Sequence, residues 1–160
     1  MSALRFRSIW RGLRSPRRAA RSRGFGIHSP FAFRFVREVL TQRYAYYCYP
    51  RLEAAASLDG VNRRMVKALF RLALFFRPEA IEVRGAISPS VALALRLGNP
   101  CPETPPEADA TCVVALPEAA PSLQLQWQQA ESGMLFQAPE LTVWVRAGHL
   151  PHQQFKISLP

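Results

Sequence analysis

The chain has 160 residues, 49% of them apolar, and a formal net charge of +10. That length and apolar content fit one domain with its own hydrophobic core. An evenly basic domain is excluded, because residues 1–37 hold ten arginines and no acid, whereas residues 38–160 hold 11 basic and 11 acidic residues. No run approaches the roughly 18 apolar residues of a membrane span. Three cysteines at irregular spacing favour a reduced compartment, so we expect a cytoplasmic protein.

Residues 1–23 are predicted to form a basic, arginine-rich arm. Three interpretations stay open for it. The arm is solvated and docks on the domain through its few apolar residues, or it contacts nucleic-acid phosphates or anionic lipid, or it is an organellar transit peptide. The apolar residues lie at the spacing of one helix face and are Phe6, Ile9, Trp10 and Leu13.

The domain predicted over residues 24–160 begins with helices. Ser29 followed by Pro30 is a strong helix start, with the serine as N-cap and the proline in the first turn. Apolar residues at helical spacing then predict a helix over residues 30–42. A cluster of tyrosines follows, which either packs its rings together, the more common outcome, or forms a stacking surface for bases. The tyrosines are Tyr44, Tyr46, Tyr47 and Tyr49.

A further helix is predicted over residues 63–76, after a turn and cap at residues 59–62. Residues 30–76 are therefore expected to form a helical N-terminal part. Pro78 ends this part, and an apolar strand begins at Ile81. The order helix, strand, glycine turn, helix is an α/β pattern.

Residues 81–160 are predicted to form a reduced sheet part. Residues 98–110 hold four prolines and are expected to be a loop, followed by a buried strand at residues 111–116. Apolar residues that alternate with glutamines then predict a half-exposed strand, with a helix as the alternative. These apolar residues are Leu123, Leu125 and Trp127.

Two more strands are predicted at residues 141–146 and 154–159. The loop between them has the length of a hairpin connection, which predicts that the two strands pair in antiparallel fashion. This loop carries His149 and His152, but no third ligand lies near them in the sequence. A hairpin tip therefore explains the two histidines better than a metal site does.

The turn around Gly85 is the most informative segment for function. A strand that carries Glu82 enters a helix through this glycine. Such turns hold nucleotide-like cofactors, because glycine lets the backbone approach the ligand and the helix start offers free N–H groups. Arg84 places a long cation where bare backbone would be expected. Residues two apart in a strand point to the same side, so Glu82 and Arg84 are predicted to pair, unless Arg84 points to solvent.

Three blocks of the sequence carry a resemblance to a known family. Residues 26–31 resemble the signature G-[IV]-H-S-P-F, residues 69–97 resemble a helix and a YF-x-P turn before I-L-E-[LI]-G-T-S-x-G, and residues 141–159 resemble closing strands with Q-x-x-F-x-[IL]. On these blocks, the chain resembles a Bacteroidetes-type family of class I S-adenosylmethionine-dependent methyltransferases. The resemblance implies a truncated Rossmann-like α/β methyltransferase sheet, mainly parallel with a C-terminal antiparallel hairpin, preceded by N-terminal helices.

The resemblance also implies S-adenosylmethionine as the cofactor and an unidentified methyl acceptor as the partner. The amino-acid end of the cofactor would lie over the glycine turn, beside Glu82, Gly85 and Ser88. The family's first turn glycine aligns with Arg84 and its second with Ser88, and Gly85 takes a position usually held by threonine. Cofactor binding is therefore expected to be impaired or lost, and no catalytic residue is assigned.

The length of the chain argues against a full methyltransferase sheet. Only 79 of the 160 residues follow Ile81, and one βαβ unit takes roughly 30 residues. Two alternatives to a methyltransferase-like protein therefore stay open. One is a non-enzymatic binding protein that uses residues 1–23 on nucleic acid or an anionic membrane surface, and the other is a decayed gene product.

Overall fold

The computed structural model describes residues 16–17, 20, 23–24, 26–76, 80–98 and 111–160. Most of the predicted arm, Pro78 and the predicted loop after Gly98 lie outside these residues.

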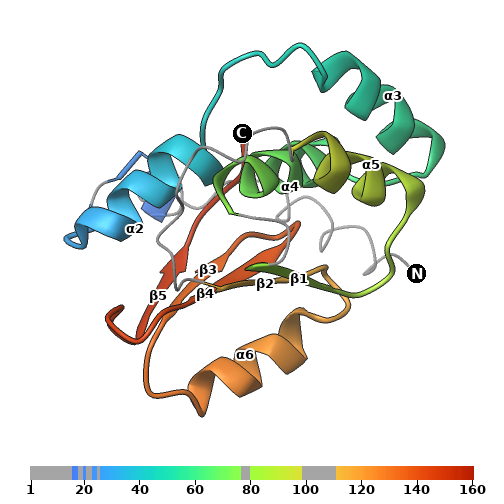
Figure 1. Ribbon diagram of the computed structural model, residues 1–160. Coiled ribbons are helices and arrows are strands. Elements are labelled where there is room, and N and C mark those ends of the chain that lie inside the picture. The colour runs from blue at the N-terminus through green and yellow to red at the C-terminus, as the bar shows by residue number, and fades with distance from the viewer. Residues whose placement is uncertain (1–15, 18–19, 21–22, 25, 77–79, 99–110) are drawn as a thin grey trace, which may run out of the picture.

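The described elements form three layers, with the sheet in the middle (Figure 1). Helices α2, α4 and α5 and the π-helix η2 cover one face, α3 packs against α4 and α5, and α6 covers the other face. The helices are α2 Pro30–Arg34, η2 Phe35–Leu40, α3 Tyr49–Leu58, α4 Arg63–Phe75, α5 Pro89–Leu97 and α6 Ala120–Gln128. The strands are β1 Ile81–Arg84, β2 Thr111–Ala115, β3 Met134–Gln137, β4 Thr142–Arg146 and β5 Gln153–Lys156.

The five described strands form one open sheet in the order β1-β2-β4-β3-β5. β1 pairs with β2 in parallel and β3 pairs with β5 in parallel, while β4 runs antiparallel between β2 and β3. All described strands except β4 therefore run in the same direction, so the sheet is mostly parallel. It has helices on both faces, and the predicted α/β class is confirmed.

The predicted C-terminal antiparallel hairpin is wrong. β4 pairs with β2 and β3, and β5 lies at the far edge of β3. The loop length that predicted a hairpin is a local signal, whereas the pairing is decided by burial. β4 is buried over residues 142–145 and needs a partner on each side, and β5 places Phe155 on Phe136 with ring centroids 5.3 Å apart.

The predicted helices are confirmed at their starts. Ser29 caps α2 by accepting from the Ala32 N–H at 3.3 Å, and Asn62 caps α4 by accepting from the Arg64 N–H at 2.9 Å. Residues 30–40 continue from an α-helix into a π-helix, where the Thr41 N–H donates to the Val36 carbonyl. Sequence patterns missed two elements, the ten-residue helix α3 and the four-residue strand β3.

The segment around Leu125 is a helix, so the predicted strand is wrong and its alternative is right. Leu123 and Trp127 are buried one helical turn apart, whereas Leu125 is 61% exposed. On a strand these three residues would share one face. Of the glutamines that seemed to alternate with them, Gln124 is half-buried and accepts from Gln137 on β3, whereas Gln126 and Gln128 are exposed.

The tyrosine cluster divides into two pairs. Tyr46 and Tyr49 pack around Phe70, with ring centroids 5.1 Å and 5.9 Å from it. Tyr44 and Tyr47 are exposed. The predicted packing is thus found for Tyr46 and Tyr49, and a stacking surface for bases stays a prediction.

Candidate functional site

The glycine turn lies at the carboxyl edge of the parallel pair β1–β2. Gly85 follows β1 directly with φ +116°, and the Leu116 N–H donates to the Arg84 carbonyl at 2.9 Å, which ties the two strand ends together. A Cβ at Gly85 would lie 2.5 Å from Oε1 of Glu118 and 2.9 Å from Cβ of Leu116. Both the backbone conformation and the lack of space therefore require glycine here.

A carboxylate of the chain itself occupies this turn. The Ala86 N–H donates to Oε1 of Glu118 at 2.7 Å. This hydrogen bond lowers the pKa of Glu118 below its ordinary value, because it stabilises the charged form. Glu118 follows β2 by three residues, so the end of the second strand supplies the group that fills the turn after the first.

A second carboxylate lies at the start of α5. The Ser90 N–H donates to Oδ2 of Asp59 at 2.6 Å, and Ser88 caps the helix by accepting from the Val91 N–H at 3.3 Å. Hydrogen bonds from the Ser90 side chain and then from its backbone lower the pKa of Asp59. The free N–H groups that make a helix start attractive to an anionic ligand thus bond to Asp59 and Ser88.

Glu82 and Arg84 pair as predicted. Nε of Arg84 lies 2.6 Å from Oε1 of Glu82, and Nη1 of Arg84 donates to Oε1 of Gln126 on α6 at 2.5 Å. Oε2 of Glu82 lies 3.9 Å from Nη2 of Arg146 on β4. The hydrogen bond from Arg84 is the largest cause of the lowered pKa of Glu82. Both oxygens of this carboxylate therefore face guanidinium groups.

The structure gives each predicted cofactor residue an intramolecular role. Glu82 bonds to Arg84, Gly85 lies against Glu118, and Ser88 caps α5. Sequence reasoning missed Asp59 and Glu118 as parts of this site. A signal existed for Glu118, because an acid just after a buried strand lies at the same sheet edge as the turn after the neighbouring parallel strand.

The loop between β4 and β5 carries the two histidines of the sequence analysis, His149 and His152. His152 stacks on Trp127 with ring centroids 4.0 Å apart, and its Nε2 lies 2.8 Å from the Trp127 carbonyl. Among the described residues, no group of three or more side chains could hold a metal ion. The same part of the chain has no helix long and apolar enough to cross a membrane.

Neither a family model, nor a curated protein, nor a solved structure matches this chain.

Proposed function

We propose that this chain is a class I methyltransferase-like α/β protein whose glycine turn no longer holds S-adenosylmethionine, and that its role is non-enzymatic. The observation that carries this proposal is the occupation of the turn by the chain's own side chains. Glu118 bonds to the Ala86 N–H, and Asp59 bonds to the Ser90 N–H.

The charge of the cofactor opposes its entry. Its amino-acid end carries a carboxylate, which needs donors such as the N–H groups of the turn, and an ammonium, which needs an acid. The donors already bond to two carboxylates, so a third anion would meet both repulsion and competition. The acid expected for the ammonium, Glu82, is bonded to Arg84 and also faces Arg146.

The test is thermal unfolding of the full chain with S-adenosylmethionine or S-adenosylhomocysteine. A ligand that binds only the folded state raises the Tm, so we expect no rise for the wild type. A saturable rise in the Tm of the wild type would contradict the proposed loss of S-adenosylmethionine binding.

A gain-of-binding variant tests the methyltransferase relation itself. Combining Arg84→Gly with Glu118→Ala removes the closer of the two guanidinium partners of Glu82 and frees the Ala86 N–H, so S-adenosylhomocysteine should raise the Tm of the double variant. Glu131→Ala, a change at an exposed acid outside the turn, serves as the control and should show no response. A folded double variant without any response would remove the support for the methyltransferase relation.

A second function is favoured by the distribution of charge. Residues 1–37 hold ten arginines and no acid, which is the composition of a segment that binds polyanions. We therefore also propose non-enzymatic binding of nucleic acid or an anionic membrane surface through this part of the chain. Binding that weakens steeply with salt and disappears when residues 1–23 are deleted would support it, and salt-independent binding would contradict it.

A further inference from the structure

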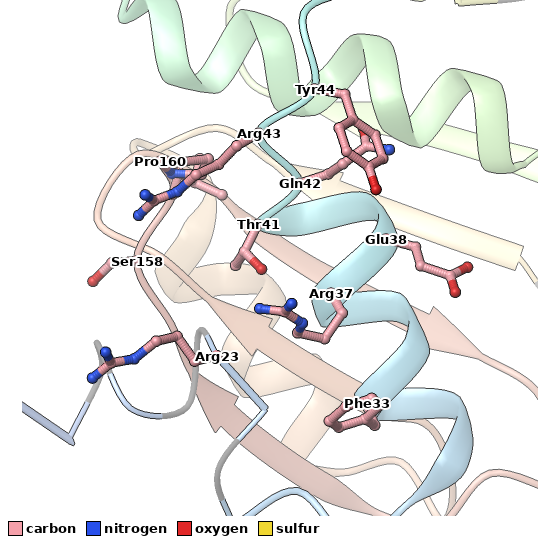
Figure 2. Close-up of a pocket in the computed structure, with 11 residues that line it drawn as sticks. Arg23, Phe33, Arg37, Glu38, Thr41, Gln42, Arg43, Tyr44, Ser158 and Pro160 are labelled. Carbon is pink, nitrogen blue, oxygen red and sulfur yellow. The ribbon is translucent and has the colours of Figure 1, made fainter.

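A cavity of about 840 Å³ lies beside η2 and the C-terminal segment (Figure 2). Its lining includes Arg23, Arg37 and Arg43 together with Phe33 and Tyr44. No residue of the glycine turn lines it. The cavity is therefore a feature separate from the candidate cofactor site.

The cavity is cationic, because its described lining residues include three arginines and one acidic side chain. Arg23, Arg37 and Arg43 are exposed, and none of them forms an ion pair within the part of the chain that the structure describes. The acid that lines the cavity, Glu38, bonds to Nε of Arg34 at 2.9 Å. Since residues 1–37 contain no acid, the N-terminal arm cannot neutralise these three guanidinium groups either.

The wall of the cavity that carries Arg37 is anchored. This residue lies on η2, and a π-helical turn is rare and found frequently at functional sites. The buried Arg71 holds the end of η2 by donating to the carbonyls of Val39 and Leu40, at 2.5 Å and 2.9 Å. The helix that carries Arg37 is thus tied at its end to the core of the domain.

Two aromatic rings complete the lining. Tyr44 is 75% exposed and Phe33 is 46% exposed, whereas Tyr46 and Tyr49 of the same cluster pack around Phe70. Exposed rings beside guanidinium groups that have no ion pair with any described residue are the combination that holds single strands, because rings stack on bases while cations contact phosphates.

From these contacts we infer that the cavity binds single-stranded nucleic acid, with phosphates at Arg23, Arg37 and Arg43 and a base stacked on Tyr44. This inference rests on the binding function proposed above and gives it a site within the folded domain. A single strand can enter a hollow surface, whereas a flat bilayer cannot. The shape of the site therefore favours nucleic acid over an anionic membrane.

The first test replaces the three arginines by glutamine in the full chain and measures the fluorescence anisotropy of labelled oligouridine. Loss of three phosphate contacts should weaken binding at least about tenfold and reduce the slope of log affinity against log salt by about 2. The control variant removes the same charge by replacing Arg51, Arg63 and Arg96, which are exposed on other helices. Equal weakening in both variants would overturn the inference, because binding would then follow net charge alone.

The second test separates stacking from charge. Tyr44→Ala should weaken binding of oligouridine roughly fivefold or more, and Tyr44→Phe should preserve it. Tyr47→Ala is the matched control, because Tyr47 is fully exposed in the same segment but does not line the cavity. An equal loss in both alanine variants, or no loss in either, would contradict a base on Tyr44.

Three comparisons distinguish this inference from the broader binding function. No binding of oligouridine or oligothymidine by the wild type would overturn both. If binding vanishes when residues 1–15 are deleted but is unchanged by Tyr44→Ala, the cavity is not the binding site and the arm is the binding element. Tighter binding to phosphatidylserine vesicles, with the same dependence on the three arginines, would overturn nucleic acid as the occupant.

Discussion

Two carboxylates from distant parts of the sequence close the turn after β1. Asp59 ends α3 and bonds to Ser90, and Glu118 follows β2 and bonds to Ala86. Each side chain takes the place that an anionic ligand would take at such a turn. The bonds depend on the charged state of the two acids, so the closure of the turn depends on pH.

Replacing Asp59 by Asn and Glu118 by Gln should lower stability at neutral pH and not in acid. The pKa of each acid is lowered in the folded protein, so the stabilisation is present above the ordinary carboxyl pKa of about 4 and is lost as the pH falls through the folded-state pKa. The measurement is the Tm of the wild type and the double variant, followed by circular dichroism from neutral pH to about pH 2. A difference in Tm that stays constant over this range would contradict the charged closure, and Glu131→Gln should show no difference.

Arg71 is a buried cation that bonds to backbone carbonyls and a phenol. Its guanidinium donates to the carbonyls of Val39 and Leu40 and to Oη of Tyr49, and it forms no ion pair within the described ranges. Burial raises the pKa of Tyr49, and the charge of Arg71 opposes this rise. The side chain acts as a cap for the end of η2, because helix ends leave carbonyls without intrahelical donors.

Arg71→Met should lower the free energy of unfolding by at least about 2 kcal/mol, because it leaves two buried carbonyls without a donor. Arg71→Lys should restore only part of this loss, since one ammonium cannot reproduce the planar fork of a guanidinium. Denaturation by urea, monitored by circular dichroism, measures both changes. Arg63→Met, at the exposed start of the same helix, is the control, and equal stability of the two Met variants would contradict the capping role.

The elements that could be predicted from the sequence carry their signals locally. Ser29 and Asn62 each mark a helix start, and each accepts a hydrogen bond from the backbone of the helix it caps. The strand at β2 was evident from its continuous apolar run. The pairing of β5 with β3 was not, because strand order depends on contacts between distant residues and a loop length does not determine them.

The candidate site was likewise predictable where its residues lie close together in the sequence. The turn at Gly85 and the pair of Glu82 with Arg84 follow from the spacing of residues within one strand and its turn. Asp59 and Glu118 lie 31 and 32 residues from their partners, Ser90 and Ala86. The packing of α3 brings Asp59 to the turn, and no local pattern in the sequence records that packing, whereas the position of Glu118 just after the buried strand β2 was a signal that could have been used.

The contact between α4 and α5 is close because Gly98 ends α5. A Cβ at this position would lie 2.5 Å from Cβ of Ala73 and 2.5 Å from the Phe70 carbonyl oxygen, both on α4. Gly98→Ala should therefore lower stability by about 1–3 kcal/mol, the usual effect of overpacking, which a thermal melt detects as a fall of several degrees in Tm. Gly148→Ala is the control, since a Cβ there meets nothing within 4 Å, and a similar Tm for both variants would contradict the close approach.

The sheet of the whole molecule is covered unequally on its two faces. On one face, η2, α4 and α5 contribute to a large apolar cluster, and on the other face α6 is the one described helix, covering a small cluster (Figure 1). The small cluster consists of Val113, Ala115, Leu123, Trp127, Leu135 and Trp144. Because one helix covers this face of the described sheet, the stability of the second layer depends on a few side chains of α6.

Leu123→Ala should therefore destabilise the protein by about 2–5 kcal/mol, since it opens a cavity in the small cluster. Leu125→Ala should change stability by less than about 0.5 kcal/mol, because Leu125 is 61% exposed on the opposite side of α6. Urea denaturation monitored by tryptophan fluorescence measures both, since Trp127 and Trp144 lie in the same cluster. Equal losses would mean that both leucines share one buried face, as they would on a strand, and would contradict the three-layer arrangement.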